Sequence, residues 1–224
     1  MTAEQDPFPV SSRNRVKRAH ERGAYDRESV YAILDAMPLC HVGYSIDGQP
    51  YVTPTIQWRD GGRIFWHGSS ASRMLRTVAG GVPVCLTVTL FDGLVLARAP
   101  FHHSANYRSA MLYGRARAVT DIGEKAVALD RLMDRLVPGR RAEVRANTAQ
   151  ELKATTVVSM AIEEASAKVR TGPPKDDAED YGSVDCWAGV LPLAQIWGEP
   201  EPDPAMRTAR PVPEAIRRMV GTAL

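Results

Sequence analysis

Short apolar runs separated by glycine-containing turns dominate the first half of the chain. These runs, rich in β-branched and aromatic side chains, occupy residues 39–46, 51–58, 64–66, 82–90 and 94–98. Such runs are typical of β-strands rather than helices. Asp-Gly pairs at 47–48, 60–61 and 92–93 supply the positive φ angles of tight turns, so we expect three hairpins. Hairpins this close together indicate an antiparallel meander or barrel rather than a parallel α/β sheet.

Helical periodicity is confined to a few segments. Apolar residues at 30, 33, 34 and 37 predict one helix, which Asp26 can cap and Pro38 ends. Apolar residues at 129, 132, 133 and 136 predict a second, which Asp121 and Glu124 can cap. Shorter helical patterns follow residues 72 and 148 and lie near 216–220. Further strands are expected at 110–119, 155–162 and 187–197, and the charged, Gly- and Pro-rich residues 168–182 are expected to form a loop.

The fold class that follows is mainly β with peripheral helices, in one domain. We expect a basic N-terminal arm over residues 1–25, the β domain over 26–200, and a C-terminal tail with a short helix over 201–224. The arm is rich in arginine and lysine. We interpret it as a flexible or peripherally docked segment, with contact to a neighbouring subunit or an anionic ligand as the alternative.

Composition narrows the classes of function. The chain has 224 residues, of which 44% are hydrophobic and 24% charged, with a formal net charge of +2. These values are ordinary for a globular protein, and the charge is too balanced to indicate a nucleic-acid partner. The three cysteines are far apart and fit neither a disulfide framework nor a zinc site. With no apolar signal core or membrane-length run, we expect a cytoplasmic protein without a membrane partner.

A Gly/Ser-rich turn follows the strand that ends at Trp66. His67, Gly68 and Ser69 lead into a helical pattern that starts near Ser72 and Arg73. A helix start exposes unpaired N–H groups, and serine hydroxyls with an arginine there make a seat for a phosphate or another anion. The alternative is that a serine simply caps the helix and the arginine is a solvated charge. The turn is neither a Walker loop nor a dinucleotide fingerprint.

The histidines and tryptophans offer a few further candidates. His67 can donate a proton near neutral pH, or it can be a satisfied structural histidine. His102 and His103 are adjacent and point to opposite faces of an extended chain, so we expect no metal ion between them. Trp66 is the tryptophan we place nearest the turn, and the alternative is that it belongs to the core.

Five segments in the same order resemble one known family. They are PYVTPTIQW at 50–58, IFWHGSSASR at 64–73, DGLVLARAPFHHSANYRS at 92–109 ahead of MLYGRARAV, EASAKVR at 164–170 and WAGVLPL at 187–193. Over roughly residues 13–200 the chain is similar to pyridoxamine 5′-phosphate oxidase-like flavoproteins, and most similar to the flavin-nucleotide-binding branch that includes nitroimidazole-resistance proteins. The resemblance implies an antiparallel split β-barrel and a homodimer with FMN at the subunit interface.

The resemblance also implies which residues hold the flavin. Residues 53–55 would run past the isoalloxazine ring, residues 66–69 would line the ring and ribityl chain, and residues 72–73 would hold the phosphate. Polar contacts would come from residues 106, 108 and 109, in some members from the second subunit, and an aromatic residue at 187 would close over the flavin. The implied FMN-binding residues are Thr53, Pro54, Thr55, Trp66, His67, Gly68, Ser69, Ser72, Arg73, Asn106, Arg108, Ser109 and Trp187.

The function we predict is an FMN-dependent oxidoreductase that exchanges electrons with a small-molecule donor or acceptor, nitro compounds included. His67 is the candidate catalytic proton donor. The late segment WAGVLPLAQIW lacks the Arg-x-His cluster with which the oxidase binds pyridoxal phosphate, and this argues against pyridoxamine phosphate oxidation. Two alternatives stay open: a flavin carrier or sensor without turnover, and a split barrel that uses haem or a deazaflavin.

Overall fold

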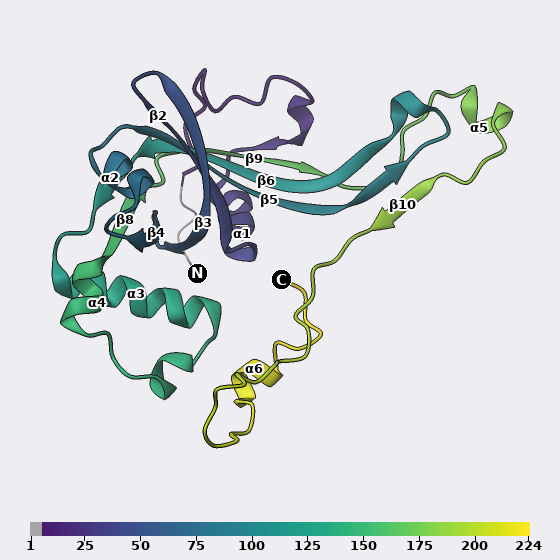
Figure 1. Cartoon of the computed structure of the whole chain (residues 1–224). Helices are drawn as coiled ribbons and strands as arrows, with labels where there is room; N and C mark the ends of the chain where they lie inside the picture. The colour runs from purple at the N-terminus through teal and green to yellow at the C-terminus, as the bar shows by residue number, and fades with distance from the viewer. Residues whose placement is uncertain (1–5) are drawn as a thin grey trace.

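The computed structural model describes residues 6–224, which form a ten-stranded sheet that curls into a barrel-like body (Figure 1). All of the strand pairings are antiparallel, in the order β1-β9-β6-β5-β2-β3-β4-β8-β7, and β10 pairs with β5. The strands are β1 (Gly23–Ala24), β2 (Leu39–Ile46), β3 (Gln49–Asp60), β4 (Arg63–Ser69), β5 (Pro83–Leu96), β6 (Ser104–Arg115), β7 (Arg117–Ala118), β8 (Thr155–Ala161), β9 (Glu164–Arg170) and β10 (Gly189–Pro192). The predicted fold class, an antiparallel split barrel, is confirmed.

Helices lie around this sheet rather than inside it. The α-helices are α1 (Arg27–Ala36), α2 (Arg73–Ala79), α3 (Ile122–Leu136), α4 (Ala149–Ala154), α5 (Asp180–Ser183) and α6 (Glu214–Arg217). Three 3₁₀ turns complete the set: η1 (His20–Arg22), η2 (Pro100–His102) and η3 (Arg140–Glu143). Asp26 and Asp121 accept hydrogen bonds from backbone N–H groups at the starts of α1 and α3, as their sequence positions predict.

Two of the three predicted hairpins form, and the third prediction is wrong. Asp47 and Gly48 adopt φ angles of 48° and 80° between β2 and β3, and Gly61 turns β3 into β4 with φ 56°. At the third Asp-Gly pair β5 continues straight on, with a bulge between Phe91 and Gly93. The reason is non-local: β6 keeps pairing with β5 beyond the bulge, so this pair is an irregularity within a strand.

A second correction concerns the segment after residue 164. The loop expected over residues 168–182 begins only after Arg170, because β9 extends to that residue and pairs with β6. Pro54, a residue within β3 that has no backbone N–H, lies where β3 pairs with β2 alone, since β4 joins only at residues 57–60. On the side of β3 that has no neighbouring strand, the missing N–H of the proline costs no inter-strand hydrogen bond.

The core is divided by the sheet into two clusters. The larger fills the barrel between the strands, α1 and α2, and contains Trp66 with no exposed surface. The smaller packs α3 against the other face, where the Trp58 and Phe65 rings stack with centroids 5.6 Å apart. Successive residues of β4 therefore alternate between the two clusters, which decides on which side each predicted site residue lies.

Gln57 connects the sheet to the end of α1. Its side chain is 1% exposed, and Nε2 donates to the carbonyl oxygens of Leu34 and Met37, each at 2.7 Å. Oε1 of the same amide has no hydrogen-bond partner within residues 6–224. Carbonyl groups at a helix C-terminus have no partner within the helix, so this glutamine acts as their cap.

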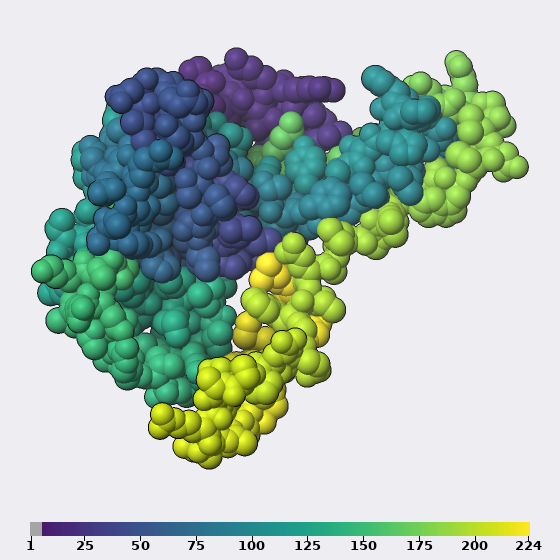
Figure 2. All heavy atoms as spheres, viewed as in Figure 1, coloured from purple at the N-terminus to yellow at the C-terminus, as the bar shows by residue number. Residues whose placement is uncertain are grey.

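The distal half of the β5–β6 ribbon projects from the body as an arm. At its end β10 pairs with residues 93–96 of β5, and from there the chain runs back as a tail toward α3 (Figures 1 and 2). Most side chains of residues 179–224 are exposed. Across residues 6–224, none of the helices combines the length and apolar character needed to cross a membrane.

The basic N-terminal segment packs along β9. Phe8 is 2% exposed, Asn14 donates to the backbone carbonyl of Ala165, and Arg13 forms an ion pair with Glu164. The first five residues of the predicted arm lie outside the described part of the chain. From residue 6 onward, the segment is joined to the sheet by both apolar and charged contacts.

Candidate functional site

A cationic and aromatic group forms where α2 meets β3. Ser72 caps α2, its hydroxyl accepting a hydrogen bond of 3.4 Å from the N–H of Leu75. The exposed guanidinium of Arg73 lies over the Tyr51 ring, with its carbon 4.5 Å from the ring centroid. This contact uses the face of the guanidinium and leaves its edge N–H groups available for an anion.

The same group includes one of the predicted residues of β3. The Tyr51 ring stacks on Tyr44 at 5.5 Å, and the Tyr44 hydroxyl lies 3.4 Å from Thr53 Oγ1. Thr55, two residues further, lies on the same face of β3, whereas Pro54 points to the opposite face. The structure thus brings Thr53, Ser72 and Arg73 together around two tyrosines that the sequence interpretation missed. Alternation along β2 and β3 was the signal that could have placed those rings.

The Gly/Ser turn shapes the entry into α2. A Cβ on Gly68 would lie 3.1 Å from Leu75 Cδ1, so glycine lets α2 pack closely on β4. Ser69 Oγ accepts from the N–H of Ala71 at 3.2 Å, and Ser69 O accepts from the N–H of Ser72. Trp66 is a core residue, and its indole Nε1 has no partner in the described chain.

His67 lies on the other face of β4, on the α3 side. Its ring centroid is 5.8 Å from that of Trp58, in an edge arrangement. Nδ1 is buried and has no hydrogen-bond partner among residues 6–224. Burial lowers the pKa of this imidazole, since desolvation disfavours the charged form. Burial therefore favours the neutral form of the His67 imidazole, and the ring faces away from the Arg73 group.

Two exposed apolar side chains lie on the same face of the sheet as this histidine. Ile56 lies on the same face of β3 as Trp58, and its register partner on β2 is Leu39. Their exposed fractions are 39% and 46%, unusual for strand residues beside a core. A neutral imidazole can bind a metal ion, and exposed apolar side chains on the same face can contact a flat, apolar cofactor that carries the ion.

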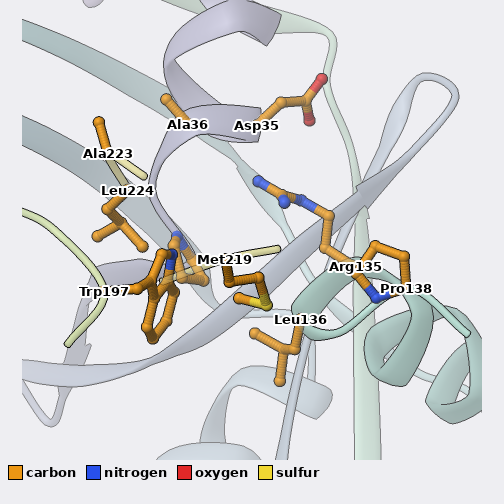
Figure 3. Close-up of a pocket in the computed structure, with 10 residues that line it drawn as sticks. Asp35, Ala36, Arg135, Leu136, Pro138, Trp197, Met219, Ala223 and Leu224 are labelled. Carbon is orange, nitrogen blue, oxygen red and sulfur yellow. The ribbon is translucent and has the colours of Figure 1, made fainter. Parts of the chain in front are cut away.

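A cavity of about 250 Å³ opens between the ends of α1 and α3 and the C-terminal tail (Figure 3). Leu136, Trp197 and Met219 give it a largely apolar wall, and Asp35 and Arg135 supply its charges. The tail thus covers part of the surface where α1 and α3 end. The residues that line the cavity are Asp35, Ala36, Pro38, Arg135, Leu136, Pro138, Trp197, Met219, Ala223 and Leu224.

The remaining predicted residues lie on β6 and in the segment just before β10. Arg108 forms two hydrogen bonds with Asp92, at 2.9 and 2.7 Å, and this hydrogen-bonding raises the pKa of the guanidinium. Ser109 Oγ donates to the carbonyl of Lys168 at 3.3 Å, and Asn106 Nδ2 donates to that of Gly172 at 3.2 Å. Trp187 is 69% exposed. Within one chain, the part of β6 on the arm and the segment between α5 and β10 lie apart from α2 (Figure 1).

Arg170 is a buried cation that the sequence interpretation did not place in the site. It is 8% exposed and donates to Asn106 Oδ1 and to the carbonyls of Gly172 and Pro173. Burial, and secondly the charge of Arg22, lower its pKa. Its position at the last residue of β9, within the EASAKVR segment, was the only signal available from the sequence.

Comparison with known proteins gives a family and several structures. The family described as pyridoxamine 5′-phosphate oxidase matches residues 26–169. The flavocytochrome Anf3 from Azotobacter vinelandii is 48% identical, with a TM-score of 0.90 over 96% of this chain and 100% of that one. An FAD- and haem-binding protein from Mycobacterium smegmatis is 39% identical, with a TM-score of 0.85 over 89% of this chain and 98% of that one.

More distant structures share the fold alone. A candidate 5-nitroimidazole antibiotic resistance protein from Bacteroides thetaiotaomicron is 22% identical, with a TM-score of 0.54 over 66% of this chain and 86% of that one. Among curated protein sequences, none matches this chain.

Proposed function

Because the chain belongs to the pyridoxamine 5′-phosphate oxidase family, we propose that it is a redox protein that binds a flavin nucleotide and a haem in separate sites. A flavocytochrome and an FAD- and haem-binding protein, 48% and 39% identical, support this pair of cofactors. The observation that carries the proposal is the position of His67, a half-buried histidine whose neutral form burial favours, on the same face of the sheet as the exposed apolar side chains Ile56 and Leu39.

The residues around Arg73 fit the anionic part of a flavin nucleotide. The guanidinium of Arg73 offers N–H donors that have no hydrogen-bond partner among residues 6–224, the Tyr51 ring packs on its face, and Thr53 offers a hydroxyl on the same face of β3 as Tyr51. One cation with a helix start suits a phosphate or pyrophosphate group. We propose FAD as the flavin, following the 39% identical relative, and FMN is the alternative from the sequence resemblance.

The residues around His67 fit a haem. A histidine ring nitrogen is a common axial ligand, and an apolar surround controls solvent access and the potential of the iron. Here His67 would bind the iron, Trp58 holds the imidazole ring by its edge contact, and Ile56 and Leu39 would exclude water. This role replaces the proton-donor role that the sequence suggested for His67, because its neutral ring faces away from the Arg73 group.

When bound, a flavin supplies two-electron chemistry and a haem supplies one-electron steps. We propose that the protein acts as an oxidoreductase between a small-molecule electron donor and an acceptor. The arm residues predicted to contact flavin lie apart from α2 in one chain, and this supports a homodimer in which the partner's arm completes the flavin site. The exposed Phe91 and Leu94 side chains on the arm are suited to such an interface.

The absorption spectrum of the purified full-length protein tests the proposal. We expect the paired bands of oxidised flavin and a Soret band, with heat-released flavin identified as FAD by chromatography. His67→Ala should lose the Soret band and keep the flavin, whereas His20→Ala, at an exposed histidine, should keep both. A wild-type protein without a Soret band after haem reconstitution, or a His67→Ala protein with an unchanged one, would refute haem ligation.

The flavin seat has its own test. Arg73→Ala should weaken flavin affinity roughly ten- to 150-fold, since a charge-assisted hydrogen bond contributes about 1.5–3 kcal/mol and each 1.4 kcal/mol is a factor of about ten. Arg76→Ala, at an exposed arginine three residues further along the same helix, should leave the flavin affinity unchanged. Equal flavin affinities for wild type and Arg73→Ala would show that Arg73 does not bind the flavin. Release of FMN instead of FAD on heating would show that FMN is the cofactor.

A further inference from the structure

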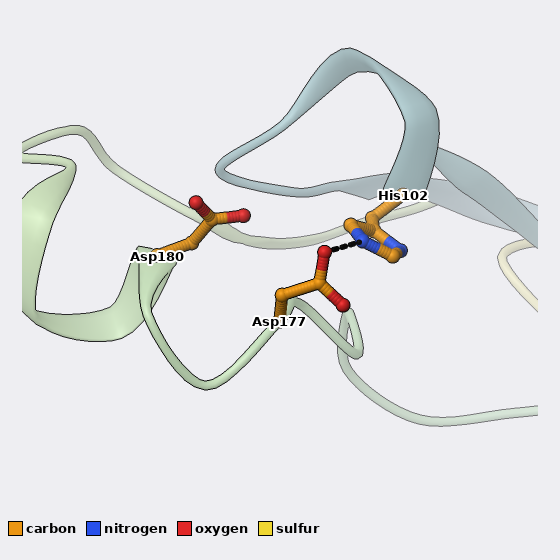
Figure 4. A group of neighbouring side chains, drawn as sticks. All are labelled: His102, Asp177 and Asp180. Atoms are coloured by element: carbon orange, nitrogen blue, oxygen red, sulfur yellow. Dashed lines mark hydrogen bonds and ion pairs between the residues drawn. The ribbon is translucent and has the colours of Figure 1, made fainter.

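Three side chains able to bind a metal ion converge at the end of the arm (Figure 4). His102 ends the turn η2 between β5 and β6, and Asp177 and Asp180 come from the segment after β9. One donor atom from each lies within 4.8 Å of the other two, and His102 Nε2 is 3.2 Å from Asp177 Oδ2. The cluster unites two parts of the chain that are 75 residues apart.

Neighbouring contacts hold the two segments in this position. Asp176, whose side chain has no exposed surface, pairs with Arg98 Nη1 at 3.1 Å and accepts from the Arg98 backbone N–H at 2.9 Å. The Arg98 guanidinium also lies over the Tyr181 ring, at 4.7 Å. Asp176 and Tyr181, which directly flank the two aspartates in the sequence, thus both contact Arg98 just before η2. Because these contacts hold the segment in place, little conformational entropy should be lost when the donor atoms bind an ion.

The two carboxylates of the cluster carry more negative charge than the neighbouring cationic side chains balance. Asp177 pairs with His102, and neither Asp177 nor Asp180 has a lysine or arginine partner in the described chain. The nearby cation Arg98 is already paired with Asp176. Two carboxylates within 4.8 Å repel each other, and a divalent cation between them would replace that repulsion with attraction.

The spacing suits a first-row transition ion. Two ligands about 2.1 Å from a zinc ion, at the tetrahedral angle of about 109°, are separated by about 3.4 Å. The separation of His102 Nε2 and Asp177 Oδ2, 3.2 Å, is close to this value. One imidazole with two carboxylates leaves a coordination position for water, and the nitrogen ligand favours zinc or nickel over magnesium.

We propose that His102, Asp177 and Asp180 form a divalent transition-metal site that fastens the segment after β9 to the end of the arm. His103 takes no part, because its Nδ1 lies 3.0 Å from the Ala99 carbonyl oxygen instead. The adjacent histidines therefore have different partners, and the ion is held by residues distant in the sequence.

Calorimetric titration of the metal-free, untagged full-length protein with zinc tests this site. Cys186→Ser is the background, because Cys186 is an exposed thiol that could bind zinc itself. We expect one zinc ion per chain at this site and an affinity for magnesium at least a hundredfold weaker. His102→Ala and Asp180→Asn should each weaken zinc binding at least tenfold, and His103→Ala should change it less than twofold.

Hydrogen exchange provides the second measurement, which does not depend on counting ions. Zinc should slow exchange of the amides in residues 100–104 and 177–183 in the background protein, and not in Asp180→Asn. Absence of zinc binding at millimolar concentration would overturn the proposal. So would unchanged binding in both His102→Ala and Asp180→Asn, since the ion would then be held elsewhere.

Discussion

Gln57→Leu is the substitution that tests most directly how the sheet fixes α1. The variant keeps the size of the side chain and removes both hydrogen bonds from Nε2 to the carbonyls of Leu34 and Met37. Both carbonyls belong to buried residues at the end of the helix, so water cannot readily replace the lost donor. Ile56, which belongs to the proposed haem site, directly precedes Gln57 on the strand.

The expected cost follows from these contacts. Two neutral hydrogen bonds contribute roughly 1–3 kcal/mol, and leaving their buried acceptors unpaired adds about 1–3 kcal/mol. Removing the unpartnered Oε1 and adding apolar side-chain surface offset about 1–2 kcal/mol of this. The net loss should be about 2 kcal/mol in the free energy of unfolding. For a chain of this size that corresponds to a fall in Tm of about 4–8 °C.

Urea unfolding followed by circular dichroism measures the difference, with wild type and variants at the same cofactor loading. Gln49→Leu is the matched control, because Gln49 is an exposed glutamine on the same strand. It should change stability by less than about 0.5 kcal/mol. If Gln57→Leu cost no more than this control, the amide would not be the cap that its geometry indicates.

A charged variant adds a pH dependence of known sign. In Gln57→Glu the carboxylate would face two carbonyl oxygens in a buried site, which raises its pKa above the value of about 4.3 in the unfolded chain. The stability deficit relative to wild type should therefore be smallest below about pH 4.3 and grow as the pH rises through the folded-state pKa. A deficit that is constant across this range would show that the site is open to water.

Three further predictions concern other parts of the chain. Gly93→Ala should detach β10 and speed proteolysis and amide exchange in residues 189–192, because a Cβ at φ 145° would lie 2.5 Å from the Leu191 carbonyl oxygen; unchanged exchange would contradict the close approach. Burial raises the pKa of Cys40 to about 12, so iodoacetamide at pH 8 should label exposed Cys186 and leave Cys40 unmodified; equal labelling would contradict that burial. Thr148→Ala removes the capping box of α4 and should cost about 1 kcal/mol in urea unfolding, and a cost near zero would show that the cap is dispensable.

The parts of the fold that local chemistry determines were predictable from the sequence. Asp47-Gly48 and Asp60-Gly61 form turns because their neighbours on both sides pair with each other at once. The same dipeptide at Asp92-Gly93 became a bulge, because β6 and β10 hold β5 on both sides there. Those partners come from distant segments, so the dipeptide alone could not distinguish the two outcomes.

The candidate site shows the same limit. The segment 64–73 identified the turn and the helix start, and Ser72 and Arg73 lie together as expected. Alternation also implies that His67 and Gly68 face opposite sides of β4. The sequence does not show which side of the sheet carries α3, or that the Nδ1 atom of His67 has no hydrogen-bond partner among residues 6–224. Both features depend on packing between α3 and the sheet, which no local pattern encodes.

The position of β10 on the edge of β5 has a consequence for synthesis of the protein. Residues 93–96 leave the ribosome about a hundred residues before 189–192, which at 5–20 residues per second is a delay of roughly 5–20 s. During that interval this strand edge is unpaired on one side and bears Leu94, an exposed apolar residue. The nascent chain is therefore most exposed to misassociation after β6 has formed and before the last third of the chain has been translated.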